Sequence, residues 1–174
     1  DGAFLFLLHM ISKMKPPQEG GSSIAIVFNG SPGFNGDAGS GESKIRQYLI
    51  ANDLIEAIIG LPKDLFYNTN IGTYVWVLRN KKSNERKGKI QLVNAVEFSE
   101  KMPKSLGKKT KYISDKQIKQ ICLIYNSFKE SEHCKIFDTI DFGYTKVHLE
   151  LTDVNEDGNP KKETVIKNQK DLLF

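Results

Sequence analysis

The stretch LIEAIIGLPKDLFYNTNIGTYVWVLR, Leu54–Arg79, contains two apolar runs of strand length separated by a short polar segment. The first run ends at Pro62, and the second begins near Ile71 and is rich in β-branched and aromatic residues. Only nine residues, 62–70, separate the runs, whereas a helical crossover between parallel strands needs about a dozen or more. The second run is therefore predicted to be antiparallel to the first.

Helical and strand-like patterns alternate along the rest of the chain, which predicts an α/β fold. SSIAIVF, residues 22–28, is an unbroken apolar run, a pattern typical of a strand that is covered on both faces in a parallel sheet. Three other elements are expected in the first hundred residues: a helix over Ala3–Lys15, a helix over about Ser43–Asn52 and a strand within 89–98. Ser114 is expected to cap a helix with apolar positions at helical spacing, namely Ile118, Ile121, Cys122, Tyr125 and Phe128. A strand with Val147, Leu149 and Leu151 on one face and a short strand near Val165 would follow.

Charge is distributed unevenly along the 174 residues. The chain is 39% apolar, enough to bury one ordinary core, and carries a net charge of +4. Residues 79–111 hold eleven lysines and arginines against three glutamates. This segment is either a solvated basic loop or the place where a polyanion binds.

Cysteine content and hydropathy indicate the cellular compartment of the protein. Cys122 and Cys134 are isolated, with neither a disulfide framework nor a CxxC pair, which favours a reducing environment. The longest apolar run, AFLFLLHMI, has nine residues, far fewer than the roughly 20 needed to cross a bilayer. The sequence therefore predicts a soluble, cytoplasmic protein with no membrane partner.

Several motifs resemble known ligand-binding motifs but lack a residue that binding requires. GDAGSGES, 36–43, has the glycine spacing of a phosphate-binding loop, but Glu42 stands where the lysine is required. DVNEDGNPKKET, 153–164, begins like a calcium loop but has Thr164 where the bidentate carboxylate is needed. His133 and Cys134 are too few ligands for a structural zinc, and no serine nucleophile elbow occurs. The motifs alone predict no metal site and no complete active site.

The loop between the two central runs contains adjacent aromatic residues, Phe66 and Tyr67. Large aromatic side chains in a loop often pack back into the core, so one interpretation is that Phe66 plugs the core and Tyr67 covers it. In open α/β sheets, however, ligands bind beyond the carboxyl ends of the parallel strands. The loop leaves that edge, so the second interpretation places Phe66 and Thr69 at a functional rim.

Three blocks carry a family resemblance: DGAFLFLLHMISKMK (1–15), the block from SSIAIVFNGSPGF to TYVWVLRNKK (22–82) and FDTIDFGYTKVHLE (137–150). In order and spacing they resemble the modification subunit of type I restriction-modification systems, the N6-adenine DNA methyltransferase subunit. The likeness covers roughly residues 1–150. In that family the glycine-rich S-adenosylmethionine loop and the Asn-Pro-Pro-aromatic motif lie upstream of the first block, and neither occurs in this sequence.

The resemblance implies a fold and a division of the chain. The fold would be α/β, a partial Rossmann-like S-adenosylmethionine-dependent methyltransferase sheet carrying the fifth to seventh strands, the last antiparallel, with a C-terminal helix and short strands. Residues 1–98 would be the C-terminal half of the catalytic domain, 99–150 a basic loop, a helix and the start of the C-terminal region, and 151–174 a polar tail. The abrupt start is expected to be a truncation, and the isolated chain is expected to be inactive.

The same resemblance implies site residues at the flipped base and the DNA cleft, namely Phe66, Thr69, Thr73, Asn29, Gly30 and Ser31. NTNIGTYVWVL corresponds to the family's Thr-Gly-Ile-x-Thr element, with Asn70 in place of the glycine, and Asn tolerates a positive φ better than most residues. Phe66 corresponds to the aromatic residue that lies against the flipped adenine. A methyltransferase must extrude the base because its exocyclic amine is inaccessible inside the duplex.

The implied cofactor is S-adenosylmethionine, bound by the parent enzyme at a site outside this chain, and the implied partners are DNA and the specificity and restriction subunits. The alternative is a non-enzymatic module that uses the basic segment 79–111 to bind nucleic acid or a partner protein. For the DNA backbone, the candidate contacts in this segment are Lys81, Lys82, Arg86 and Lys87.

Overall fold

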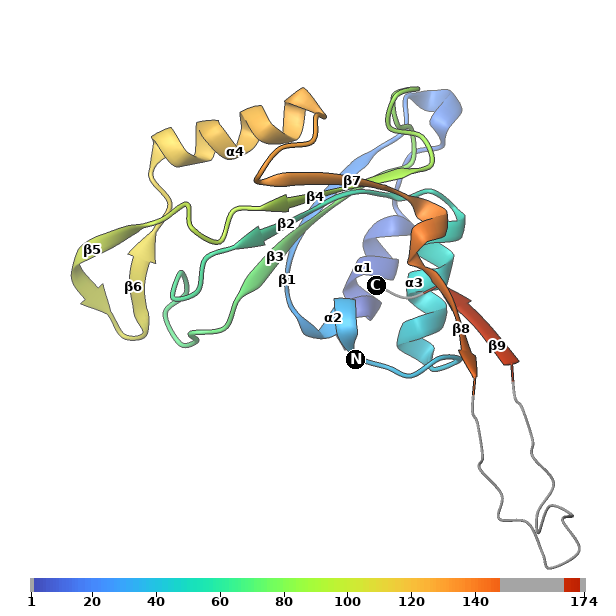
Figure 1. Ribbon diagram of the computed structural model, residues 1–174, viewed down its shortest axis with the longest axis horizontal. Coiled ribbons are helices and arrows are strands. Elements are labelled where there is room, and N and C mark those ends of the chain that lie inside the picture. The colour runs from blue at the N-terminus through green and yellow to red at the C-terminus, as the bar shows by residue number, and fades with distance from the viewer. Residues whose placement is uncertain (1, 148–167, 173–174) are drawn as a thin grey trace, which may run out of the picture.

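The computed structural model describes residues 2–147 and 168–172. Within them, five strands form one mixed sheet with helices on both faces, in the order β1 (Ser23–Asn29), β3 (Thr73–Arg79), β2 (Ile55–Leu61), β4 (Lys89–Asn94) and β7 (Cys134–Asp138) (Figure 1). β8 (Gly143–Val147) pairs with β9 (Asn168–Leu172) in a separate ribbon. The predicted positions Leu149, Leu151 and Val165, and the calcium-like stretch 153–164, lie outside the described residues.

The predicted reversal between the two central strands is confirmed. β3 lies between β1 and β2 and is antiparallel to both, whereas β2 and β4 are parallel. The carboxyl ends of β1, β2 and β4 therefore lie on the same edge of the sheet as the first residue of β3. We call this edge the rim, defined by Asn29, Leu61, Thr73 and Asn94.

The prediction that residues 22–28 form a strand covered on both faces is wrong for the described part of the chain. β1 pairs with β3 alone and forms an edge of the sheet. Ile24 and Phe28 face the core, but Ala25 and Val27 on the opposite face are exposed, and Val27 is 50% exposed. The unbroken apolar run thus combines one buried face with one apolar face that no described residue covers.

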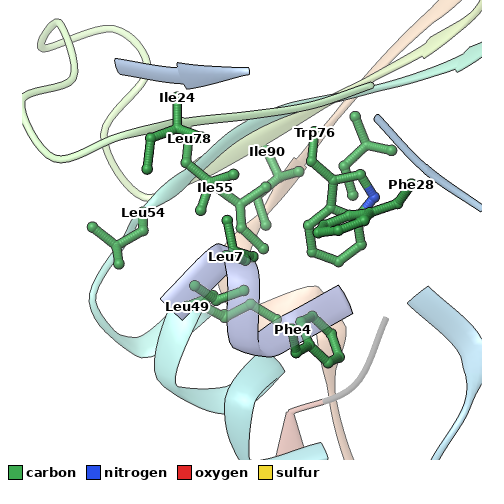
Figure 2. Close-up of a cluster of buried hydrophobic side chains, with 12 residues drawn as sticks. Phe4, Leu7, Ile24, Phe28, Leu49, Leu54, Ile55, Trp76, Leu78 and Ile90 are labelled. Carbon is green, nitrogen blue, oxygen red and sulfur yellow. The ribbon is translucent and has the colours of Figure 1, made fainter. Parts of the chain in front are cut away.

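The main core lies between one face of the sheet and helices α1 (Gly2–Ile11) and α3 (Gly41–Ala51) (Figure 2). Phe4 of α1, Phe28 of β1 and Trp76 of β3 meet edge to face, with ring centroids 5.5–6.3 Å apart. Such aromatic pairs add about 0.5–1.5 kcal/mol beyond their area burial. Trp76 therefore links α1 to the centre of the sheet.

Helix α4 (Asp115–Ser127) covers the opposite face through Ile121, which packs with the cluster around Ile59 and Val93. The predicted cap is confirmed, because Ser114 and Gln117 form a capping box. The buried face of α4 is narrower than predicted, because Ile118 is 47% exposed and Cys122 is also exposed. Only the stripe that touches the sheet is buried.

Several predicted boundaries shift. α1 ends at Ile11 rather than Lys15, and α3 begins at Gly41 because Ser40 caps it by accepting a hydrogen bond from the Ser43 amide at 3.2 Å. Strand β7 pairs with β4, so the sheet extends past the boundary predicted at residue 98. The remaining short helices are η1 (Pro17–Glu19), α2 (Ser31–Phe34) and η2 (Thr139–Phe142).

The glycine-rich segment is organised from inside by a buried arginine. Arg46 of α3 is 0% exposed, and its guanidinium donates to the carbonyl oxygens of Pro32, Asn35 and Gly36 at 3.0, 2.6 and 3.3 Å. Buried carbonyl groups need such donors. Arg46 therefore holds the chain that leads into the segment resembling a phosphate-binding loop, together with its first residue, Gly36.

The basic segment predicted as a loop after residue 98 forms instead a hairpin, β5 (Glu100–Leu106) and β6 (Lys109–Tyr112). Its turn docks on the β2–β3 loop, residues 62–72. The Lys108 amide donates to the Tyr67 carbonyl at 2.9 Å, and the Thr110 and Lys111 amides donate to the Asp64 carbonyl at 3.1 and 3.2 Å. Gly107, at φ 59°, lies against Tyr67. These contacts hold the loop that contains Phe66 against the hairpin.

Arg46→Met should lower the free energy of unfolding by about 2–3 kcal/mol, because buried hydrogen bonds to a charged group are lost and their acceptors stay buried. Urea denaturation should show a lower midpoint at an unchanged slope. Lys44→Met, an exposed change in the same helix, is the control. Equal midpoints for the two variants would contradict the anchoring role of Arg46.

Gly107→Ala should detach the hairpin turn, because the added Cβ would lie 2.9 Å from the Tyr67 carbonyl oxygen. Hydrogen exchange of the Lys108 and Thr110 amides should accelerate. Gly88→Ala is a matched control, since Gly88 has φ 67° and a Cβ added there would have nothing within 4 Å. Both variants carry the cost of a left-handed backbone at a non-glycine residue, roughly 1–2 kcal/mol. Unchanged exchange in Gly107→Ala would show that the turn does not depend on this contact.

Candidate nucleic-acid interface

The aromatic residues of the β2–β3 loop lie outside the core. Phe66 and Tyr67 are 41% and 62% exposed, and neither belongs to the two buried clusters. Phe66 and Thr69 face each other across a tight turn as an isolated antiparallel bridge, and the Thr69 hydroxyl accepts from the Ile71 amide at 3.3 Å. The interpretation of Phe66 as a core plug is therefore wrong, and its ring is available at the rim.

Asn70 needs no left-handed backbone in this turn. The described non-glycine residues with positive φ are Asp53, Asp64 and Phe128. The conformational strain in this loop thus falls at Asp64, at φ 65°, whose carbonyl receives the two hairpin amides. The exchange of glycine for asparagine at position 70 is accommodated without cost at φ.

Thr73 and Asn29 are brought together by the sheet register. Thr73 begins β3 and lies opposite both Asn29 of β1 and Leu61 of β2. Thr73 is 6% exposed, and its buried hydroxyl has no hydrogen-bond partner among the described residues. Asn29 is exposed and its side-chain oxygen accepts from the Ser31 amide at 3.1 Å, which turns the chain at Gly30.

A cavity of about 680 Å³ opens on the side of the sheet that faces α2, and its walls include Asn29, Gly30, Tyr74, Asn94 and His133. Gly60 also lines it, and a Cβ added there would lie 3.6 Å from the Tyr74 ring, at ordinary van der Waals contact. Phe66, Thr69, Thr73 and Ser31 do not line it. Of the six predicted cleft residues, Asn29 and Gly30 therefore lie at the cavity. Phe66 and Thr69 lie in the loop, and Thr73 and Ser31, which begin β3 and α2, belong to neither group.

Two of the four predicted DNA-backbone residues are buried. Lys82 is 7% exposed; its ammonium lies 2.6 Å from the Asp53 carboxylate and donates to the Lys89 carbonyl at 3.0 Å. Burial lowers the pKa of Lys82, and Asp53 opposes that shift. Lys81 and Lys87 are exposed. Lys82 thus ties the β3–β4 turn to the end of α3 and has no access to a phosphate in this structure.

Arg86 is equally buried and holds α4 to the sheet. Its guanidinium lies between the rings of Tyr125 and Phe128, 4.7 and 4.3 Å from their centroids. It donates to the Gln91 side-chain oxygen at 2.9 Å and to the Tyr125 carbonyl at 2.6 Å. Arginine suits such a stacked and hydrogen-bonded position.

A carboxylate joins the same network. Glu56 of β2 is 1% exposed, accepts a hydrogen bond from the Tyr125 hydroxyl and lies 3.5 Å from the Arg79 guanidinium. Burial, with the hydrogen bond to Glu56, raises the pKa of Tyr125 to about 12. Lys82 and Arg86 are therefore used to build the interior, and Arg79 pairs with a buried carboxylate, whereas Lys81 stays exposed.

The described residues contain no group of three or more His, Cys, Asp or Glu that could hold a metal ion. His133 packs edge to face on Phe98, and the Cys134 sulfur accepts from Gln91 at 3.2 Å. Within 2–147 and 168–172, no helix has the length and apolar character required to span a membrane.

Comparison with known proteins gives the family. The N-6 DNA methylase family matches residues 1–159. The type I restriction enzyme MjaVIII methylase subunit of Methanocaldococcus jannaschii is 39% identical over 101 residues, which are 58% of this chain and 17% of that protein. The MpnII methylase subunit of Mycoplasma pneumoniae is 33% identical over 126 residues, 72% of this chain and 20% of that protein. The chain thus spans about a fifth of the length of these relatives.

Solved structures agree with this result. The type I restriction-modification methyltransferase subunit of Streptococcus thermophilus superposes with a TM-score of 0.68 at 28% identity, covering 82% of this chain and 28% of that one. A putative type I modification subunit from Vibrio vulnificus, at 15% identity and a TM-score of 0.61, shares the fold. The family match over most of the chain is decisive: this chain belongs to the N-6 DNA methylase family.

Proposed function

We propose that this chain forms part of the catalytic domain of a type I DNA methyltransferase subunit that transfers a methyl group from S-adenosylmethionine to adenine N6. The observation that carries the proposal is the exposed Phe66 on the rim, inside a sequence block that matches the family. Family membership favours this enzyme over a non-enzymatic binding module.

The sheet topology supports a place within a larger methyltransferase sheet. The family resemblance implies a Rossmann-like sheet whose last strand is antiparallel, and β3 is antiparallel to both of its neighbours. The free edge and the exposed apolar face of β1, at Ala25 and Val27, would suit further elements of the same domain. Exposed edges and apolar faces of this kind are usually covered.

The proposed role of Phe66 is to stack on the extruded adenine. Base flipping costs a few kcal/mol of unpairing and unstacking, and stacking on an aromatic ring returns about 1–3 kcal/mol. Thr69 fixes the turn that carries Phe66, through the hydrogen bond to the Ile71 amide. Thr73, Asn29, Gly30 and Ser31 would border the same cleft along the rim.

We propose that the binding site for the methyl donor and the motif that binds the target amine lie in other parts of the subunit, because an Asn-Pro-Pro-aromatic sequence does not occur in this chain. The isolated chain is accordingly proposed to be inactive. The proposed partners are DNA and the specificity and restriction subunits of a cytoplasmic complex, in which the specificity subunit selects the target sequence.

Phe66→Ala in the complete methylase subunit, assembled with its specificity subunit, should weaken capture of the flipped base by about 1–3 kcal/mol because the stacking contact is lost. The measurement is the fluorescence of a duplex with 2-aminopurine at the target position, together with the rate of methylation. Both should change relative to wild type.

Tyr48→Ala is the control, since Tyr48 is a similarly exposed aromatic residue (46%) on α3, outside the β2–β3 loop. It should leave the fluorescence and the methylation rate unchanged. Wild-type fluorescence and rate in Phe66→Ala would contradict the stacking role.

A further inference from the structure

We propose that the β5–β6 hairpin is the surface through which this chain grips the DNA backbone, next to the nucleotide that Phe66 receives. The proposal deepens the proposed function and rests on it for the identity of the polyanion. It places the contact with the DNA backbone on the hairpin rather than on the β3–β4 turn, which contains the four candidate residues predicted from the sequence.

The hairpin is strongly basic. Between residues 100 and 112 its five lysines face one acidic residue, Glu100. The lysines are exposed or half-buried, and none forms an ion pair among the described residues; they are Lys101, Lys104, Lys108, Lys109 and Lys111. Glu100 accepts from the Tyr112 hydroxyl at 2.7 Å, and this hydrogen bond lowers the pKa of Glu100. The only carboxylate of the hairpin is thus at its base, away from the turn.

The hairpin and the Phe66 loop are one structural unit. Backbone hydrogen bonds from Lys108, Thr110 and Lys111 end on Asp64 and Tyr67, the residues that bracket Phe66. Figure 1 shows the hairpin beside the β2–β3 loop at the same end of the sheet. A duplex that presents a base to Phe66 would therefore bring its phosphates to the hairpin lysines.

The β3–β4 turn, residues 80–88, is poorly placed for the same contact. β3 runs from Thr73 at the rim to Arg79, which lies opposite Ser23 at the far end of β1. Seven strand residues separate the two edges by roughly 20 Å. Lys82 and Arg86 are buried, and Lys87 donates to the Asn84 side chain at 2.9 Å. The turn thus offers few free cations, at the wrong edge.

Phosphate contacts of this kind would position the duplex without reading its sequence. Each lysine that neutralises a phosphate releases a counterion, so the affinity falls with salt by a log–log slope of about 0.9 per contact on duplex DNA. This dependence distinguishes a phosphate-binding hairpin from a solvated one.

The test uses this chain and a fluorescein-labelled duplex of mixed sequence, with binding followed by anisotropy at several salt concentrations. Lys104→Gln/Lys108→Gln removes two exposed hairpin charges. We expect a loss of roughly ten-fold per contact at 0.1 M salt and a slope reduced by about 0.9 per contact. Lys81→Gln/Lys87→Gln removes two exposed charges from the β3–β4 turn and should leave the slope unchanged.

Equal losses from the two double variants would overturn the proposal, since they would show a response to net charge rather than to the hairpin. Absence of salt-dependent binding by the wild-type chain would also overturn it. If the hairpin effect holds while Phe66→Ala methylates normally in the complete subunit, the hairpin stands and the proposed stacking role fails.

Discussion

The short connection between β2 and β3 determines the strand directions at the centre of the sheet. With too few residues for a crossover helix, the chain must reverse and place β3 antiparallel to β2. β3 then pairs along its whole length with β1 on the other side. This arrangement puts Thr73 at the rim, Trp76 in the core and Arg79 at the far edge, and it leaves the connection itself exposed at the rim.

The exposed connection is stabilised by a segment far from it in sequence. Without the hairpin, a loop with Phe66 and Tyr67 in solvent would have little to fix it, because neither ring is buried. The hairpin supplies backbone donors to Asp64 and Tyr67 and a glycine that permits close approach to Tyr67. The chain thus separates its cations into two sets. Lys82 and Arg86 build the interior through Asp53, Gln91 and Tyr125, and the hairpin lysines remain on the surface.

Local patterns in the sequence predict the features that local physics determines. The reversal at β3, the Ser114 cap and the α/β class follow from connection length, capping chemistry and periodicity. The rest depends on partners distant in sequence. Lys82 and Arg86 lie in a stretch whose composition is typical of a solvated turn. Their burial depends on Asp53 and Tyr125, which lie 29 and 39 residues away. The run that forms β1 is as apolar as a doubly covered strand, but one of its faces has no cover among the described residues.

The candidate site divides in the same way. The exposure of Phe66 could be inferred from its place in a short loop on the rim, whereas the hairpin beside it could not, because β5 lacks the apolar alternation of a buried strand. A signal was available in Gly107, which separates two short segments as in a hairpin with a glycine-containing turn. The cavity beside Asn29 depends on Gly60 and Tyr74 meeting across β2 and β3, and no single stretch of sequence shows that pairing.

We propose that the β2–β3 loop and the hairpin together form one DNA-facing surface at the rim. The most direct measurement is the change in amide chemical shifts of the isotope-labelled chain on titration with duplex DNA. We expect the changes to concentrate in residues 64–73 and 104–111 and the β3–β4 turn, residues 80–88, to stay unperturbed. Shifts centred on residues 80–88, with the hairpin unchanged, would contradict it.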